Sequence, residues 1–469
     1  MTINVPDPTT PVVHGDLGVR LVGDELTAPC LDGVERTYLS LDAGASTPAL
    51  GEVAARIQEF LPWYSSVHRG AGYKSQLSTL AYEEAREAVL RFAGRDPDRD
   101  VAILCRNTTE AINHLAFRLG LRPDDVVATT VVEHHANLLP WRRFATCRFV
   151  EVGEAGTFGV HDVERVLDEQ PTPKLLAITG ASNVTGWMPP VDDIVAAAHA
   201  RGVPVLVDAA QLAPHRPLPV SPDFVAWSGH KMYAPFGTGV LIGPRTAFEE
   251  GDPFLAGGGA VDLVDLDEVV WTAPPDREEA GSPNVLGAVA LHAAIETFEA
   301  LGWDAIVQHE LALATRLRRG LAAIDGVRLL GPSLEEPTLA VGTFVVDGMS
   351  HALVAARLSA EHAIGVRHGC FCAHPYLLRL LGLDDAEIRA YRDDVLAGDR
   401  RRIPGAVRAS ASLSTTPADI DRFLDALAQI VATPSVHPYE QEPTTGDYWP
   451  TDPRWSDRRR SLGAPCSRG

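Results

Sequence analysis

The stretch that most constrains this chain is residues 223–231, Asp-Phe-Val-Ala-Trp-Ser-Gly-His-Lys. Its apolar run predicts a buried strand over residues 224–227, which leads through Ser228 and His230 to Lys231. A lysine at the exit of a buried strand costs free energy unless its charge is neutralised or its amine takes part in chemistry. The stretch therefore requires either a salt-bridge partner for Lys231 or a reaction that uses it.

A second apolar strand, predicted over residues 203–207, precedes this one and ends at Asp208. A strand ending in Asp, followed by a strand ending in Ser-Gly-His-Lys, is typical of a pyridoxal 5′-phosphate (PLP) site. There the lysine amine carries the cofactor aldehyde and the aspartate holds the pyridinium nitrogen. The alternative is two unrelated strand ends with a salt-bridged Lys231.

Composition argues against several classes of protein. The chain has 469 residues, enough for a large core and two domains, and its net charge of −21 argues against nucleic acid or an anionic membrane as a main partner. No window approaches about 18 continuous apolar residues, and the N-terminal residues lack the basic and apolar regions of a signal peptide. Six sparse, irregularly spaced cysteines favour a reduced, cytoplasmic protein.

From residue 101 onward, apolar strands alternate with helices. Strands are predicted over residues 101–104, 126–132, 148–152, 175–179, 203–207, 224–227 and 239–242. This alternation predicts an α/β fold with a mainly parallel sheet that helices cover on both faces. Ligands bind such sheets at the carboxyl ends of the strands, where most polar clusters of this chain fall.

Four regions are predicted along the chain. Residues 1–36 are rich in Pro, Gly and Asp and form an irregular N-terminal arm, and residues 37–300 form a large cofactor-binding domain. Residues 301–433 form a smaller α+β domain. Residues 434–469 form an extended tail, which is ordered only if Trp449 and Trp455 dock.

Hydroxyl groups gather where a phosphate would bind. Thr108 and Thr109 open a predicted helix, where free backbone N–H groups and the helix dipole favour an anion. The alternative is an ordinary helix cap without a ligand, since threonine caps are common. Ser228 and His230, beside Lys231, strengthen the phosphate interpretation.

Three more polar side chains follow predicted strands. His134 can lie flat on a planar cofactor ring and relay protons, although a surface or core histidine is the simpler reading of one such residue. With its neighbour His135 it could form part of a metal site, but no matching third ligand lies nearby in the sequence, so no metal is predicted. Asn183 suits a ring oxygen or a substrate carboxylate, and Gln211 suits a phenolic oxygen. Each amide is otherwise a loop-stabilising group.

The second unusual stretch is residues 367–375, Arg-His-Gly-Cys-Phe-Cys-Ala-His-Pro. Its pair Cys370 and Cys372 fits half a zinc site, a redox pair, a nucleophile or two buried structural thiols. A structural zinc lacks its Cys-x-x-Cys partner, and a Gly-containing loop beside Arg367 and a histidine favours a reactive thiolate. Arg408, on a predicted strand, suits a substrate carboxylate held by two hydrogen bonds, or a surface ion pair.

With these motifs assembled, residues 38–431 resemble the class V aminotransferase-fold PLP-dependent enzymes, and among them most of all the cysteine desulfurases and selenocysteine lyase-like enzymes. The shared motifs are Val-His-Arg-Gly (67–70), Asn-Thr-Thr-Glu-Ala-Ile-Asn (107–113), Glu-His-His-Ala-Asn (133–137), Ser-Asn-Val-Thr-Gly (182–186), Val-Asp-Ala-Ala-Gln (207–211), Ser-Gly-His-Lys (228–231), Glu-Ala-Gly-Ser-Pro-Asn (279–284) and Val-Arg-His-Gly-Cys-Phe-Cys-Ala (366–373). The resemblance implies the fold-type I architecture, with a seven-stranded, mainly parallel sheet and a smaller α+β domain, and PLP as the cofactor.

The resemblance also implies which residues form the site. The cofactor would be bound by Thr108, Thr109, His134, Asn183, Asp208, Gln211, Ser228, His230, Lys231 and Ser282. His134 would stack on the ring, and Ser282 would reach the phosphate of the neighbouring subunit, which implies a homodimer. The substrate would be oriented by Asn183, Arg367 and Arg408.

The implied reaction is the conversion of L-cysteine to L-alanine. Lys231 would take the α-proton, and Cys372, which matches the persulfide-carrying cysteine of the family, would attack the substrate sulfur. A sulfur-acceptor protein is then an expected partner. Selenocysteine lyase-like members usually have His-His before the active cysteine, whereas Cys370-Phe371 is similar to the Gly-Cys-Phe-Cys loop of molybdenum cofactor sulfurases, and this difference leaves the acceptor open.

Two other functions stay open at the level of sequence. A PLP-dependent carbon–sulfur lyase or aminotransferase would act on a cysteine conjugate in a specialised pathway, and Cys372 would then be incidental. A non-catalytic binding protein on a decayed PLP fold would not need Lys231, Asp208 and His134, and their presence argues against it.

Overall fold

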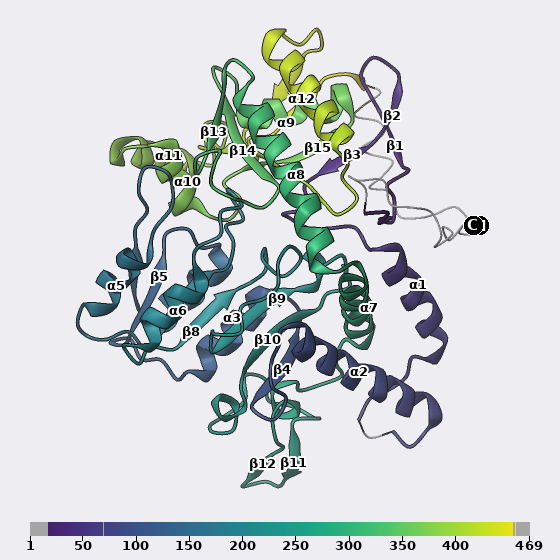
Figure 1. Cartoon of the computed structure of the whole chain (residues 1–469), viewed down its shortest axis with the longest axis vertical. Coiled ribbons are helices and arrows are strands. Elements are labelled where there is room, and N and C mark those ends of the chain that lie inside the picture. The colour runs from purple at the N-terminus through teal and green to yellow at the C-terminus, as the bar shows by residue number, and fades with distance from the viewer. Residues whose placement is uncertain (1–16, 69, 454, 456–469) are drawn as a thin grey trace.

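The computed structural model describes residues 17–68, 70–453 and 455. Its larger part is built on a seven-stranded sheet with the strand order β4-β10-β9-β8-β7-β5-β6 (Figure 1). These strands are β4 (Asp100–Cys105), β5 (Val126–Thr130), β6 (Thr146–Val150), β7 (Leu175–Thr179), β8 (Val205–Asp208), β9 (Phe224–Ser228) and β10 (Gly239–Pro244). Only β10 runs antiparallel to its neighbours. The predicted mainly parallel α/β sheet is confirmed.

Both faces of this sheet are buried, because side chains along each strand alternate between two cores. In β10, Val240 and Ile242 enter one core and Leu241 enters the other. The first core contains side chains from α1 (Gly51–Phe60), α2 (Tyr73–Phe92), α5 (Val160–Asp168), α6 (Val191–His199) and α7 (Val285–Leu301). The second contains side chains from α3 (Thr108–Arg118) and α4 (Leu139–Phe144). With both faces covered, the strand ends are left to bind a ligand.

A second, five-stranded sheet has the order β13-β14-β16-β15-β3. Its strands are β3 (Leu39–Leu41), β13 (Val327–Leu330), β14 (Val341–Val346), β15 (Ile364–Gly369) and β16 (Ala406–Ser410). They pack against α8 (Trp303–Ala322), α9 (His351–His362) and α12 (Pro417–Ala432). Strand β3, which the sequence assigned to the large domain, lies here, parallel to β15, because Leu39 and Leu41 belong to this core.

The remaining elements connect or flank these two sheets. They are α10 (His374–Leu381), α11 (Asp385–Leu396), the hairpins β1 (Thr27–Pro29)–β2 (Glu35–Thr37) and β11 (Val261–Val264)–β12 (Val269–Trp271), and the 3₁₀ turns η1 (Leu61–Trp63), η2 (His135–Asn137), η3 (Gly229–Lys231), η4 (Arg245–Phe248) and η5 (Asp276–Glu278). No single helix in the described part of the chain is long and apolar enough to cross a membrane, although α7 and α8 would pass that test as a pair, joined at an 85° bend.

A third hairpin, β17 (Tyr439–Gln441)–β18 (Tyr448–Pro450), lies where the sequence predicted an extended tail. Its base is fixed to α9, because the hydroxyl groups of Ser435 and Tyr439 donate to Glu361 Oε1 at 2.8 and 2.9 Å. Its turn is fixed to the loop after α11, where Arg400 N donates to the Pro443 carbonyl at 2.8 Å. The hairpin is therefore part of the smaller domain.

Candidate active site

A cavity of about 680 Å³ lies between the strand ends of the large sheet and the five-stranded sheet. Every site residue predicted from the sequence lines it except Ser282, which is exposed and does not reach the cavity of its own chain. The large sheet contributes residues that follow β4, β5, β7, β8 and β9, and the smaller domain contributes the loop after β15 together with β16. The rule that ligands bind at the carboxyl ends of parallel strands is obeyed here.

Lys231 projects into this cavity from η3, directly after β9. The structure gives its amine neither a hydrogen bond nor an ion pair with any described residue. Burial lowers the pKa of Lys231 to about 8, and the nearby Asp208 and Cys372 oppose that shift only in part. About a tenth of the amine is therefore neutral, and nucleophilic, at about pH 7, far more than for an ordinary lysine.

Asp208, at the end of β8, is the buried acidic group of the cavity. Its Oδ1 accepts a hydrogen bond from Ala210 N at 2.9 Å, and the structure gives its other oxygen no partner among the described residues. Burial raises the pKa of Asp208 above its usual range. A protonated pyridine nitrogen would supply the cation that this carboxylate lacks, so Asp208 and Lys231 together fit PLP.

The predicted phosphate site is assembled at the N-terminus of α3. Thr108 N donates to Ser228 Oγ at 2.7 Å, and the hydroxyl oxygens of these two residues lie 2.6 Å apart. A Cβ atom on Gly239 would lie 2.5 Å from the backbone of Asn107, so only glycine lets β10 approach this helix end. Thr109 and His230 also line this end of the cavity, where the helix dipole favours an anion.

His134 lies in the cavity as a neutral imidazole. Burial lowers its pKa to about 3, with a smaller contribution from the charge of Lys231. Its Nδ1 accepts a hydrogen bond from Ala136 N at 3.0 Å, so the proton of the neutral ring resides on Nε2. The buried carboxyl of Glu133 supports this segment by accepting hydrogen bonds from Asn137 Nδ2 at 2.7 Å and Thr179 N at 2.9 Å. The chain thus presents a flat, uncharged donor to the cavity.

Gln211 and Asn183 each use their side-chain amide to donate a hydrogen bond within the protein. Gln211 Nε2 donates to the Gly44 carbonyl at 2.6 Å, which ties the segment after β3 to the cofactor side of the cavity. Asn183 Nδ2 donates to the Phe371 carbonyl at 2.7 Å, on the smaller domain. Both residues line the cavity, as predicted, but the Asn183 amide binds the cysteine loop in this structure.

Two arginines form the cation pair expected to hold a substrate carboxylate. Arg408 is buried, and its Nη1 donates to the Asn183 carbonyl at 2.6 Å; burial lowers its pKa to about 10. Arg367 is half exposed. Asp42, which sequence reasoning missed, joins them: its Oδ1 lies 3.3 Å from Arg408 Nη2 and its Oδ2 lies 3.1 Å from Arg367 Nη2. The neighbouring paired strands β16 and β15 place both guanidinium groups at one edge of the cavity.

The loop after β15 presents Cys372 to the cavity as an exposed thiol. The Cys372 carbonyl accepts a hydrogen bond from His135 N at 2.8 Å, and the ring of His135 stacks on that of His374 at 5.1 Å. Cys370, by contrast, is half-buried, and burial raises the pKa of its thiol. Both thiols line the cavity, and Cys372 is the more exposed of the two.

Sequence reasoning missed one whole wall of the cavity. Thr445, Gly446 and Asp447, in the turn of the β17–β18 hairpin, line the cavity together with Arg400 and Arg401. His368 Nε2 lies 3.4 Å from Asp447 Oδ1, so this wall contacts the strand that leads to Cys372. No local signal pointed to it, because the hairpin strands are three residues long.

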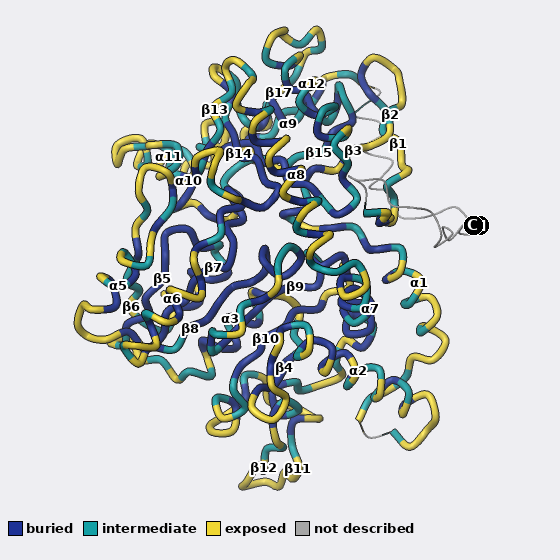
Figure 2. Tube along the Cα trace, in the orientation of Figure 1, coloured by how far each residue is buried: buried dark blue, intermediate teal, exposed yellow. Residues whose placement is uncertain are grey.

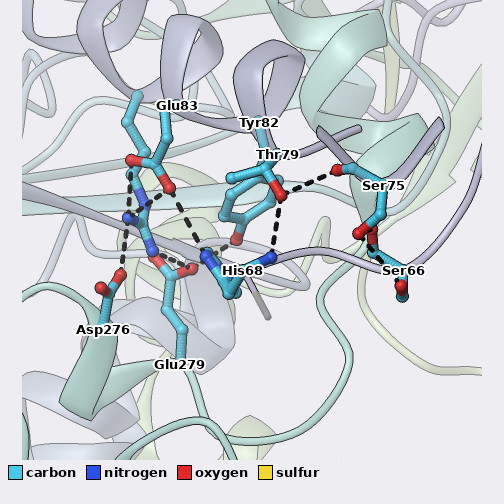
Figure 3. Close-up of polar contacts among 9 residues, drawn as sticks. Ser66, His68, Ser75, Thr79, Tyr82, Glu83, Asp276 and Glu279 are labelled. Atoms are coloured by element: carbon cyan, nitrogen blue, oxygen red, sulfur yellow. Dashed lines mark hydrogen bonds and ion pairs between the residues drawn. The ribbon is translucent and has the colours of Figure 1, made fainter. Parts of the chain in front are cut away.

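A second polar cluster lies away from the cavity, between α2 and η5 (Figure 3). His68, Glu83 and Asp276 have ligand atoms close enough together to hold a metal ion. Arg86 already bonds both carboxylates, however, with Nη1 at 3.0 Å from Glu83 and 2.8 Å from Asp276. Its Nη2 pairs with Glu279 at 2.9 Å. The cluster is an ion-pair network that joins α2 to η5.

The two sheets, with Lys231 and Asp208 facing one cavity from the strand ends, define the fold-type I class of PLP-dependent enzymes. The family model for aminotransferase class-V matches residues 39–423. The chain belongs to this class-V aminotransferase family.

Similar proteins cover most of the chain. A probable cysteine desulfurase of Streptomyces coelicolor is 33% identical over 85% of this chain and 93% of its own length. A probable cysteine desulfurase 1 of Mycobacterium leprae is 37% identical, but this chain spans only 57% of it. Among solved structures, the cysteine desulfurase of Thermococcus onnurineus has a TM-score of 0.74 at 32% identity, covering 84% of this chain and 95% of its own. The Escherichia coli cysteine desulfurase CsdA has a TM-score of 0.71 at 30% identity, covering 84% and 94%.

Proposed function

We propose that this protein is a PLP-dependent cysteine desulfurase that takes the sulfur of L-cysteine onto Cys372 as a persulfide and releases L-alanine. The observation that carries the proposal is that Lys231 and Cys372, from different domains, line one cavity. Relatives and solved structures named cysteine desulfurase, similar over most of the chain, support it. The test is the formation of alanine and enzyme-bound persulfide from L-cysteine, in the wild type and in Cys372→Ala.

The protein's own groups account for the positions that this reaction needs. Bound through Lys231, PLP would supply an electron sink next to the substrate α-carbon. Arg408 and Arg367 would hold the substrate carboxylate, since a buried guanidinium gives charge-assisted hydrogen bonds of fixed geometry. Lys231 Nζ, once free, would take the α-proton, for which a pKa near the working pH is favourable.

The sulfur step belongs to Cys372. Its thiolate Sγ would attack the substrate sulfur, so that an S–S bond forms as the substrate C–S bond breaks. The electron pair of the broken bond stays on carbon, which is protonated to give alanine, and Cys372 keeps a persulfide. Because Cys372 is exposed at the cavity, the persulfide is then accessible to a sulfur acceptor, which we propose to be another protein.

The depressed pKa of Lys231 gives a pH prediction for cofactor capture. We expect the rate at which PLP binds the cofactor-free protein to rise about tenfold per pH unit below pH 8 and to level off above it, because the neutral amine is the attacking form. Stopped-flow absorbance measures this rate, with Nα-acetyl-lysine as the reference for the ionisation of PLP itself. A rate that still climbs at about pH 10, as for an ordinary lysine, would contradict the assignment.

We further propose that the enzyme is a homodimer. The hairpin β11–β12 carries exposed apolar side chains, with Leu263 61% and Leu266 103% exposed, and it projects from the body of the protein (Figures 1 and 2). Isolated two-stranded hairpins and exposed apolar patches are both unfavourable in water. The base of the hairpin bonds the segment of Ser282, through Gly281 N to the Gly258 carbonyl at 2.7 Å. A second copy that packs on the hairpin would therefore also lie next to Ser282.

Leu266→Glu tests the dimer. We expect it to convert the dimer to a monomer, as measured by light scattering, because a charge at an apolar contact must be desolvated. Val436→Glu is the matched control, since Val436 is 88% exposed on the other side of the cavity, next to β17, and should leave the mass unchanged. A wild-type monomer at micromolar concentration, or a dimeric Leu266→Glu protein, would contradict the proposal.

A further inference from the structure

Two successive residues of the cysteine loop have left-handed backbones. Phe371 has φ of 53° and Cys372 has φ of 54°. Residues with a Cβ atom adopt this conformation only at a cost in free energy, which the surrounding contacts must offset. The conformation of Cys372 therefore depends on whatever holds Phe371.

Phe371 is held by the groups expected to bind the substrate. Its carbonyl accepts the hydrogen bond from Asn183 Nδ2 at 2.7 Å. Phe371 is only 8% exposed, and its ring lies against the Arg408 guanidinium, with the central carbon of that group 5.1 Å from the ring centroid. In a buried setting such a cation–π contact is among the stronger ones.

Arg408 is incompletely satisfied in this arrangement. Nη1 bonds the Asn183 carbonyl and Nη2 lies 3.3 Å from Asp42, but Nε is buried without a hydrogen-bond acceptor. A buried donor without an acceptor favours any ligand that supplies one. A substrate carboxylate in the cavity can reach this buried donor only if the guanidinium or the Phe371 ring against it moves.

We propose that Phe371 is the positioning residue for Cys372, and that it couples the thiol to the substrate site: binding of an amino acid carboxylate at Arg408 alters the seat of the Phe371 ring and so the position of Cys372. The left-handed backbone at residues 371–372 costs free energy, so the loop relaxes to another conformation once the contacts of the Phe371 ring change. The inference rests on the proposed substrate site at Arg408. It does not rest on persulfide chemistry.

L-Alanine is the probe, because it carries the α-carboxylate and the amine but no sulfur. The test uses the PLP-bound Cys370→Ala protein, in which Cys372 is the only thiol of its peptide. The rate of Cys372 alkylation by iodoacetamide is followed by peptide mass spectrometry, with and without saturating L-alanine. Binding of L-alanine is confirmed independently by the change in visible absorbance of the cofactor.

We expect L-alanine to change the alkylation rate by at least about fivefold, the lower end of typical coupling between sites. In Phe371→Leu, which removes the aromatic face, the rate without L-alanine should shift and the response should vanish, whereas Phe371→Tyr should keep the response. Phe371→Met serves the same purpose if the leucine variant does not bind PLP. A response preserved in the leucine or methionine variant, or absent from the parent although L-alanine binds, would overturn the proposal.

This outcome is separable from the fate of the proposed function. If the enzyme were instead a carbon–sulfur lyase, Cys372→Ala would still release pyruvate and sulfide from L-cysteine, and the alkylation response of the protein that keeps Cys372 would be unaffected. If Phe371 were only a filler of the core cluster to which it belongs, its replacement would lower thermal stability and leave the response to L-alanine intact.

Discussion

Lys231→Ala will lose the visible absorbance of the lysine-bound cofactor, and its turnover of L-cysteine will fall by roughly 10²–10⁴-fold. The physical reason is that Lys231 is the half-buried amine at the end of β9, has no partner in the described chain, and has a pKa lowered by burial to about 8. Absorbance spectroscopy and alanine release measure the two effects together. An added primary amine should restore part of the turnover, because it can replace the missing base but not the covalent link.

Lys74→Ala is the control for this variant. Lys74 lies at the exposed start of α2, where its Nζ donates to the Pro62 carbonyl at 2.7 Å, and it does not line the cavity. Its removal should change neither the spectrum nor the turnover. Retention of the lysine-bound spectrum in Lys231→Ala would mean that another amine carries the cofactor, and the assignment of the site would be wrong.

The second large effect is expected at Cys372. Cys372→Ala should form no enzyme-bound persulfide, and alanine formation from L-cysteine should fall on the order of 10³-fold or more, as is usual when an enzyme loses its nucleophile. The cofactor spectrum should persist, because the thiol lies in the smaller domain and Lys231 and Asp208 in the larger. Mass spectrometry of the intact protein detects the persulfide, and amino acid analysis detects alanine.

The chain supplies a matched control two residues away. Cys370 is half-buried, and burial raises the pKa of its thiol, so Cys370→Ala should retain both persulfide and alanine formation. Pyruvate and sulfide formed from L-cysteine at an undiminished rate in Cys372→Ala would instead indicate a carbon–sulfur lyase, because elimination of sulfide needs no thiol acceptor. If both variants lost activity and the wild-type persulfide were found on Cys370, Cys370 would be the nucleophile in place of Cys372.

The sheet and the cofactor side of the site were predictable because both depend on local pattern. Buried strands appear in the sequence as apolar runs. Because the strands are parallel, the residues that follow these runs lie together at the carboxyl edge of the sheet. Lys231, Asp208 and His134 could thus be assigned to one cavity before any contact was known. Helix α11 lacked this signal, because none of its residues is buried, and it was not predicted.

The substrate side was harder to predict because its contacts join distant parts of the chain. Asp42 binds two arginines on β15 and β16 only because β3 pairs with β15, and no pattern around residues 39–41 indicates that pairing. The contact of Phe371 with Arg408 likewise depends on the left-handed backbone of the loop, which the residue types Phe and Cys do not predict. The role of Ser282 depends on a second copy and stays a prediction.

The hairpin β17–β18 also determines how late in synthesis the cavity can be completed. The cofactor half of the cavity needs residues up to Lys231, but its outer wall includes Thr445, Gly446 and Asp447, beyond residue 423, where the family match ends. The ribosome must therefore make nearly the whole chain before the cavity has all its walls. A version that ends after α12, at residue 433, would keep the cofactor residues but lose this wall, so residues 445–447 help to enclose Cys372.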